Sequence, residues 1–223
     1  MIRQVLHIGF FKTLWFNYKY FPLKEAVYLP VILARDVQVR SCRKGFCSFL
    51  DGPKTGILRF GFGDRDHNYD RRSSLFIQGK IELVGKGIHS FGPGTCLRIG
   101  KNGILRIGSH FTCSVNNRIY CSYRITIGDD NMWSFDNIIM DTDSHIMYQK
   151  DGKISNPNKE LIFGNHVWVG CRSIILKGAS IPSGCVVASG SVITNHYNEE
   201  DSVITSNGKV IKKDIKWSRL SAF

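Results

Sequence analysis

A six-residue rhythm of apolar side chains near the C-terminus constrains the fold more than any other feature. The apolar positions are Phe163, Val169, Ile175, Ile181, Val187 and Ile193. Four residues after each of the first five comes a small or modest side chain: Val167, Ser173, Ala179, Cys185 and Ser191. A spacing of six fits neither the 3.6-residue period of a helix nor the two-residue period of a plain strand. It predicts a β-solenoid in which each six-residue unit forms one short strand and one turn.

The rhythm continues upstream with interruptions. It is kept by Ile107, Cys113 and Ile119, and again by Ile127, Trp133 and Ile139. Asn117, Asn131 and Asn137 fall at the fourth-after position, where asparagine suits a tight corner. We therefore expect an all-β chain with a solenoid over 75–198, preceded by a capping region and the start of the solenoid in 1–74. A basic tail follows in 199–223. A β-sandwich is the alternative, but its turns would not hold one spacing over six units.

The cysteine content predicts a reducing compartment. The seven cysteines are an odd number without a close-paired motif, and several occupy inward or small-residue positions of the repeat. The opening apolar stretch is interrupted by Lys12, Lys19 and Lys24, so we expect neither a secretory signal nor a transmembrane helix. The expected location is the cytoplasm, with the inner face of the membrane as a further option.

A formal net charge of +12 calls for an acidic partner. Such a charge is typical of proteins that bind nucleic acid, an anionic membrane or a phosphate-rich small ligand. Nothing in the sequence resembles a groove-reading helix, a zinc finger or an aromatic RNA-binding sheet, so we expect no nucleic acid partner.

The segment 10–28 mixes aromatic residues with lysines. Its aromatic members are Phe10, Phe11, Trp15, Phe16, Tyr18, Tyr20, Phe21 and Tyr28. This mixture fits a membrane-interface segment. It equally fits a short helix that caps the open end of the solenoid, which every repeat rod requires. We favour the cap within residues 1–33, with peripheral membrane contact as a secondary role.

The repeat breaks at Asp141–His145. The six-residue spacing predicts an apolar residue at position 145, but the sequence has histidine there. Residues 146–160 then have the composition of an exposed loop. A long loop ejected from a regular rod is usually functional. His145 therefore predicts a general base, because imidazole can accept a proton at neutral pH. Asp143, or alternatively Asp141, is expected to orient it.

Three segments carry a family resemblance: ITIGDDNMWSFDNIIMDTDSH, FGNHVWVGCRSIILKGASIPSGCVVASGSVIT and SNGKVIKKDIKW. They resemble the left-handed β-helix acyltransferases of the hexapeptide-repeat family, and among these the acetyltransferases of surface-polysaccharide gene clusters. The resemblance covers about residues 75–217. It implies a left-handed parallel β-helix with three hexapeptides per turn, an ejected loop and short flanking segments. It also implies a homotrimer, with acyl-CoA lying between adjacent subunits and His145 as the general base.

The resemblance assigns further site residues. We also expect acceptor contacts from Asn117, Asp141 and Trp168, and the resemblance implies that Trp168 lies near the acyl and pantetheine end of the cofactor. The remaining cofactor contacts that it implies are Cys171, Ala188, Ser189, Thr194, Lys209 and Lys212. Two departures affect the nucleotide end: Asn195 stands where the family commonly has lysine, and Ser206–Lys209 lacks the usual proline.

The expected function is acetyl-CoA-dependent O-acetylation of a sugar acceptor in surface polysaccharide biosynthesis, with no metal. One alternative is N-acetylation of a nucleotide-linked amino sugar. A second is a zinc solenoid of the γ-carbonic-anhydrase kind, for which His110, His145 and His166 are the available ligands, with His67, His89 and His196 further away. A third is a non-catalytic scaffold, which would not need the loop and His145.

Overall fold

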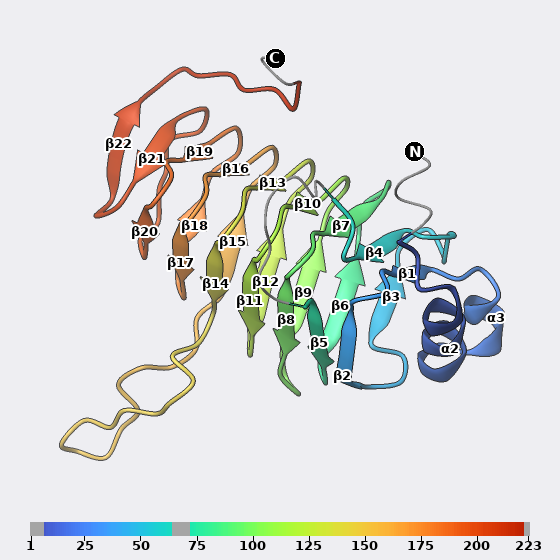
Figure 1. Cartoon of the computed structure of the whole chain (residues 1–223). Helices are drawn as coiled ribbons and strands as arrows, with labels where there is room; N and C mark the ends of the chain where they lie inside the picture. The colour runs from blue at the N-terminus through green and yellow to red at the C-terminus, as the bar shows by residue number, and fades with distance from the viewer. Residues whose placement is uncertain (1–6, 64–71, 221–223) are drawn as a thin grey trace.

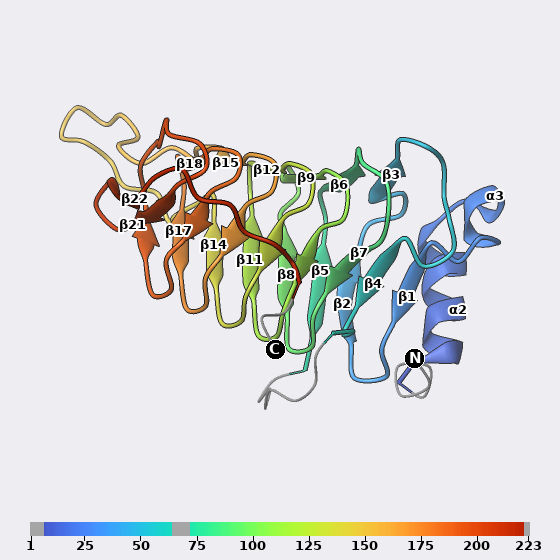
Figure 2. The ribbon, with the colours of Figure 1, turned by 90° about the horizontal axis from the view of Figure 1, so that it is seen from above.

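The chain winds into a parallel β-helix whose strands stack into three sheets along one rod (Figures 1 and 2). The computed structural model describes residues 7–63 and 72–220. Successive turns of the coil add one strand to each sheet, and equivalent strands pair in parallel. The exception is the C-terminal end, where the last strand of the chain pairs antiparallel with the strand before it. The predicted all-β parallel β-helix is therefore confirmed.

The three sheets are named here by the order in which the chain enters them. Sheet 1 contains β1 (Val31–Leu33), β4 (Leu58–Phe60), β7 (His89–Phe91), β10 (Thr112–Cys113), β13 (Met132–Trp133), β16 (Trp168–Val169), β19 (Val186–Val187), β21 (Val203–Thr205) and β22 (Lys209–Lys212). Sheet 2 contains β2 (Gln38–Cys42), β5 (Ser74–Ile77), β8 (Cys96–Ile99), β11 (Arg118–Cys121), β14 (Ile138–Met140), β17 (Ile174–Leu176) and β20 (Val192–Ile193). Sheet 3 contains β3 (Cys47–Phe49), β6 (Lys80–Leu83), β9 (Ile104–Ile107), β12 (Arg124–Ile127), β15 (Leu161–Phe163) and β18 (Ser180–Ile181).

The repeated apolar residues fill the inside of the coil. All six members of the C-terminal series, from Phe163 to Ile193, are at most 1% exposed. Alternation along each strand sends their neighbours outward, which is why one apolar position in each unit is enough. An aromatic stack also runs along the axis, formed by Phe60, Phe91, Phe111, Trp133 and Phe163 with successive ring centroids 4.8–5.3 Å apart. The core is therefore one continuous column.

The corner asparagines act through their side chains. The left-handed backbone falls on the residue before each of them, at Asn116, Asp130 and Asp136. Asn117, Asn131 and Asn137 are fully buried, and their amide groups donate to backbone carbonyl oxygens of the corners. The expectation that these asparagines themselves adopt the tight backbone is thus corrected.

The N-terminal end of the rod is covered by two helices, α2 (Phe10–Tyr20) and α3 (Leu23–Ala26) (Figure 1). Asn17 Nδ2 donates to the Val31 carbonyl (2.7 Å), and Asn17 Oδ1 accepts the Val31 N–H (3.1 Å). Thr13 Oγ1 accepts the Leu33 N–H (3.1 Å). These side chains satisfy the open backbone edge of β1, as a further strand would. Parallel pairing begins at Val31, further toward the N-terminus than residues 75–198.

Two segments leave the regular coil at the C-terminal half. Residues 146–160 extend away from the rod between β14 and β15 (Figure 1). After β22 the chain runs back along the rod toward its N-terminal half (Figure 2). Among the described residues, no helix has the length and apolar character needed to cross a membrane.

Candidate active site

The loop root is fixed to the coil by a buried carboxylate. Asp141 follows β14 and is fully buried, and its two carboxylate oxygens accept the N–H groups of Ser122 (2.7 Å) and Tyr123 (2.8 Å). Burial raises the pKa of Asp141, and these two hydrogen bonds oppose the rise. With both oxygens occupied inside the coil, Asp141 has no surface on which to meet an acceptor or His145. Its predicted acceptor contact is therefore corrected to a structural role.

A tight turn then presents His145 to solvent. Thr142 Oγ1 accepts the N–H of Ser144 (3.0 Å), and Ser144 takes a left-handed backbone with φ of 64°. The backbone carbonyl of His145 accepts a hydrogen bond from Nδ2 of Asn156 (2.8 Å), which holds the backbone of His145 in place. The imidazole is exposed and makes no hydrogen bond with any described residue. Both ring nitrogens are thus available to a ligand.

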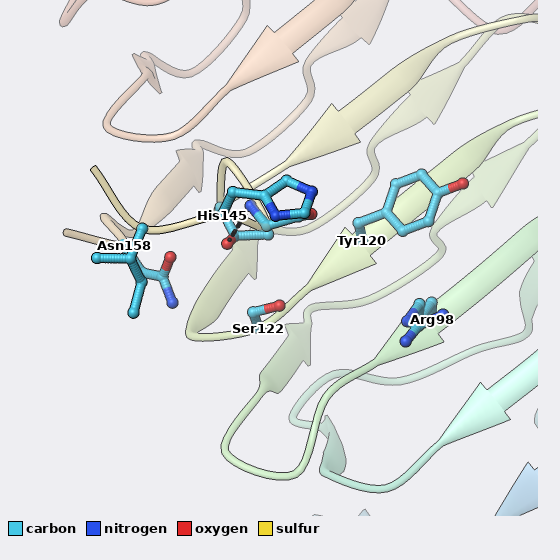
Figure 3. Close-up of a pocket in the computed structure, with 8 residues that line it drawn as sticks. Arg98, Tyr120, Ser122, His145 and Asn158 are labelled. Carbon is cyan, nitrogen blue, oxygen red and sulfur yellow. Dashed lines mark hydrogen bonds between the residues drawn. The ribbon is translucent and has the colours of Figure 1, made fainter. Parts of the chain in front are cut away.

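His145 lines an open-sided cavity of about 520 Å³ on the outer face of sheet 2. The other lining residues are Arg98, Tyr120, Ser122, Thr142, Ser144, Ile146 and Asn158. Figure 3 shows the imidazole over the same face as Tyr120, with Ser122 below it and Asn158 on the opposite side. Most of these side chains carry hydroxyl, amide or guanidinium groups, which are suited to a polar ligand.

Asp143 binds a lysine and not the imidazole. Its Oδ2 accepts Nζ of Lys177 (2.5 Å) and Nδ2 of Asn156 (2.8 Å), and these hydrogen bonds lower the pKa of Asp143. Lys177 Nζ also donates to the carbonyl oxygens of Asn156 (3.1 Å) and Pro157 (3.2 Å). The expected Asp143–His145 pair is not formed within the chain. Asp143 instead joins the start of the loop to its returning arm through Lys177.

Asn117 is also structural. It is fully buried, and its Nδ2 donates to the carbonyl oxygens of Ser114 (2.8 Å) and Ser134 (3.0 Å). Its Oδ1 accepts the N–H of Asn137 (3.3 Å), and Asn137 Oδ1 accepts the N–H of Ser173 (2.8 Å) in the next turn. The predicted acceptor contact at Asn117 is corrected, because this amide closes a corner of the coil.

Most of the predicted cofactor residues gather at the corner where the chain passes from sheet 1 to sheet 2, called here the 1–2 corner. Trp168 lies in β16 beside this corner, and its Nε1 donates to Ser134 Oγ (3.0 Å). Cys171 and Ser189 occupy equivalent places in successive turns, with Sγ and Oγ 3.5 Å apart. Ala188 directly precedes Ser189. The structure thus brings four of the predicted residues together.

The other three lie elsewhere. Thr194 follows β20 at the corner between sheets 2 and 3, called here the 2–3 corner, which also carries His145. It lines a second cavity of about 550 Å³ with Lys177, Asn195 and His196. Lys209 and Lys212 are exposed at the two ends of β22. Within one chain, His145 and the Cys171–Ser189 group therefore lie at opposite edges of sheet 2.

The histidines considered for zinc are not gathered. His166 Nδ1 contacts Asp130 Oδ2 (2.6 Å), and His166 Nε2 contacts the Trp217 carbonyl (3.0 Å). No cluster of three or more His, Cys, Asp or Glu side chains that could hold a metal ion occurs in residues 7–63 and 72–220. His67 lies outside the described residues.

Several residues of the site were not predicted from the sequence. Arg98 and Tyr120 belong to strands earlier in the chain, and only the stacking of turns brings them beneath His145. Lys177 follows an ordinary repeat unit, and its sequence context carries no sign of its pairing with Asp143. Alternation along β8 and β11 turns both side chains to the outer face, but it carries no sign of which residues lie beside them.

Comparison with known proteins gives two curated relatives. The chain is 31% identical over 129 residues to galactoside O-acetyltransferase of Escherichia coli (strain K12), a match that covers 56% of this chain and 60% of the relative. It is 40% identical over 121 residues to polysialic acid O-acetyltransferase of Neisseria meningitidis, covering 48% of this chain and 56% of the relative. Over about half of its length, the chain is similar in sequence to two saccharide O-acetyltransferases. The predicted resemblance is thereby confirmed, and the matches span less than two thirds of each curated relative.

A crystal structure of a polysialic acid O-acetyltransferase matches 83% of this chain and 77% of that chain, with a TM-score of 0.45 and 28% identity. No family model matches the chain.

Proposed function

We propose that the protein transfers an acetyl group from acetyl-CoA to a hydroxyl of a sugar acceptor. The observation that carries the proposal is the exposed imidazole of His145, which makes no hydrogen bond with a described residue. It is held at the root of an ejected loop over an open polar cavity. The names of the curated relatives, both saccharide O-acetyltransferases, support this reaction. The seven free cysteines support a reducing, cytoplasmic setting.

His145 supplies the step that the reaction most needs. A sugar hydroxyl is a weak nucleophile at neutral pH, and a base within about 3 Å of its proton removes this barrier. The unprotonated ring nitrogen accepts the hydroxyl proton while the oxygen forms a bond to the thioester carbonyl carbon. The tetrahedral intermediate then expels the CoA thiolate, which takes the proton back from the imidazolium. The acetyl ester and the free thiol of CoA balance the reaction, and no covalent enzyme intermediate is required.

The cavity beneath His145 suits a sugar that carries negative charge. Arg98 makes no ion pair with any described residue, and its guanidinium lies 4.9 Å from the Phe76 ring centroid, which keeps it on the outer face of sheet 2. Tyr120 and Ser122 add hydroxyl groups beside it. An arginine fork binds a carboxylate or phosphate through paired hydrogen bonds. An acidic saccharide is therefore the acceptor class that we propose.

The cofactor site is proposed to be shared between subunits of a homotrimer. We propose that the pantetheine arm lies along Trp168, Cys171, Ala188 and Ser189, as the resemblance implies. His145 lies across the width of sheet 2 from this group, so a second copy of the chain can bring the two edges together. Thr194, Lys209 and Lys212 remain proposed contacts for the cofactor.

Replacement of His145 tests the base. His145→Ala should keep the fold, because the imidazole is exposed and unbonded, and should reduce turnover by about 10²–10⁴-fold. The release of CoA thiol with a panel of acidic, neutral and amino saccharides measures turnover, and mass spectrometry identifies the product. His110→Ala is the matched control, because His110 is an exposed histidine at a corner far from the loop. Turnover of His145→Ala within threefold of the parent would contradict the role of His145.

The same assay tests the proposed acceptor class through a variant of Arg98. Arg98→Ala should lower kcat/KM for acidic saccharides by at least tenfold and leave neutral ones within about twofold. Arg118→Ala is the control, because Arg118 lies in the neighbouring strand of sheet 2 but outside the cavity. Equal rates with acidic and neutral saccharides in the parent would contradict the acceptor class and leave the acetyl transfer intact.

A further inference from the structure

At the N-terminal end of the rod, α2, α3 and the turn after them carry exposed apolar side chains. Figure 1 shows where these elements lie. We call these side chains the aromatic face, and its members are Phe10, Phe11, Trp15, Tyr18, Leu23, Val27 and Tyr28. Each is at least 47% exposed, and Phe11 is 82% exposed. Large exposed apolar side chains gathered on one short segment mark an interaction site.

The cap does not account for the aromatic face. Capping uses the opposite side of α2, where Thr13, Phe16, Asn17 and Tyr20 are buried and where Thr13 and Asn17 bind the β1 backbone. A short helix needs only one apolar stripe to pack on the end of a rod. The second apolar surface therefore points to a second partner.

Basic side chains surround the aromatic face. Lys19 Nζ lies 4.6 Å from the Trp15 ring centroid, and Lys19 is an exposed residue. The described basic residues of this end are Lys12, Lys19, Lys24, Arg35, Arg40, Arg43, Lys44 and Lys54, against the acidic Glu25, Asp36 and Asp51. None of these basic side chains forms a salt bridge with a described residue. The partner must therefore combine negative charge with an apolar layer.

A cavity of about 420 Å³ lies beside the face, lined by Lys12, Trp15 and Val37–Arg40. Lys12 Nζ donates to the carbonyl oxygens of Arg35 (2.5 Å) and Val37 (2.9 Å), which fixes its positive charge at this place. Arg40 is exposed at the same cavity. The cations Lys12 and Arg40 can donate hydrogen bonds to a phosphodiester in this cavity, and the indole ring of Trp15 can pack against its glycerol backbone.

We propose that the aromatic face binds the surface of an anionic phospholipid bilayer. Tryptophan and tyrosine rings favour the headgroup level of a membrane, because one part of each ring is apolar and the other is polar. The flanking lysines and arginines meet lipid phosphates and anionic headgroups. The helix lies on the membrane and does not cross it, in agreement with its 11-residue length. The cap and the membrane contact, which the sequence presented as competing roles, use two faces of one helix.

Sedimentation of the full chain with vesicles tests the proposal. The parent should bind vesicles of phosphatidylcholine with phosphatidylglycerol, bind vesicles of phosphatidylcholine alone at least tenfold more weakly, and lose affinity as salt is raised. Phe10→Ser with Phe11→Ser should weaken binding at least tenfold, because two phenyl rings leave the interface. Ile211→Ser is the matched control, since Ile211 is 60% exposed at the other end of the rod.

A second pair of variants tests the charge. Lys19→Gln with Lys24→Gln should weaken binding by about fivefold for each lysine. Lys86→Gln with Lys101→Gln, two exposed lysines away from the N-terminal end, should leave it unchanged. Unaltered melting temperatures in all variants show that the cap is intact. Equal binding by parent and N-terminal variants would overturn the proposal. A second outcome would also overturn it: the parent does not bind vesicles, and the N-terminal variants change their oligomeric state. The aromatic face would then be a contact between copies of the protein.

Discussion

At the scale of single residues, His89 is an unusual member of the core. It points into the coil from β7, pairs in register with Leu58 and is fully buried. Neither ring nitrogen has a hydrogen-bond partner among the described residues. Burial, assisted by the nearby His110, lowers the pKa of His89 from 6.5 to about 4. The folded protein therefore holds this imidazole in its neutral form.

The lowered pKa of His89 makes stability depend on pH. Below pH 6.5 the unfolded chain binds a proton that the folded chain rejects, so the free energy of unfolding should fall between pH 6.5 and pH 4 by of order 3 kcal/mol. His89→Leu should remove this loss, because leucine matches the neighbouring Leu58 and carries no unpaired polar atom. Urea unfolding at pH 7.5 and 4.5 measures the difference. His196→Leu, at an exposed site, serves as control. An equal pH dependence in parent and His89→Leu would refute this account.

At the scale of elements, residues 213–220 after β22 form a strap that is bound to the outside of the coil. Trp217 stacks on His166 with ring centroids 3.9 Å apart, and its Nε1 donates to the His166 carbonyl (3.0 Å). Arg219 donates to Asp130 Oδ1 (2.6 Å), to Thr112 Oγ1 (2.8 Å) and to two backbone carbonyl oxygens. The strap therefore joins several turns of the coil beside Trp168, whose ring centroid lies 6.0 Å from that of Trp217.

Arg219→Ala should release the end of the strap. We expect a loss of about 1–3 kcal/mol in the free energy of unfolding at pH 7, because Arg219 makes charge-assisted hydrogen bonds at a half-buried site. Burial opposes ionisation of Asp130, but hydrogen bonds from His166 and Arg219 outweigh it and lower the pKa of Asp130 below 3.8. The stabilisation is thus present above pH 3.8 and is lost as pH falls through the lower folded value. Thermal unfolding at pH 7 and pH 3 measures this, with exposed Lys216→Ala as control. A variant that unfolds like the parent at pH 7 would exclude a stabilising strap.

The fold was predictable where the turns are regular. Trp168 pairs with Val186 18 positions later, so three six-residue units make one turn and the period is visible in the sequence. Val31 pairs with Leu58, 27 positions later, because the connections between the N-terminal strands are longer. The inward residues of these strands are buried equally well. Longer connections change the number of residues between equivalent strands but leave the buried positions the same. The N-terminal turns therefore show no constant period in the sequence.

The site was predictable only in part. His145 was found because it interrupts an apolar series, a signal contained within the chain itself. Asp143 is two residues from His145, and proximity in sequence suggested a pair, yet Lys177 of the next turn takes the carboxylate. Asn117 was predicted to contact the acceptor, but its amide is buried in a corner of the coil and makes hydrogen bonds to the backbone there. Contacts between turns depend on side-chain directions at corners, and local sequence does not encode those directions.

At the scale of the whole molecule, the two halves of the proposed site lie on opposite edges of sheet 2. Cys171 and Ser189 are at the 1–2 corner, and His145 is at the 2–3 corner. The strands between them span about 10 Å, because each residue of a strand advances the chain by about 3.3 Å. The sheet face between these edges carries outward apolar side chains at Ile138 and Ile174, paired in register. A cofactor held at one edge and a base held at the other are best joined by a second subunit packed along this face.

We therefore expect a homotrimer of about 76 kDa, three copies of the 25.3 kDa chain, with sites shared between neighbours. Light scattering measures the mass, and mixing of two inactive variants tests the sharing. His145→Ala removes the base, and Ser189→Tyr blocks the proposed pantetheine path at an exposed position. When equal amounts are unfolded and refolded together, a site with both parent residues forms at about one interface in four, and activity should return to about a quarter of the parent value. A mixture as inactive as either variant, in trimers of the expected mass, would place the complete site within one chain.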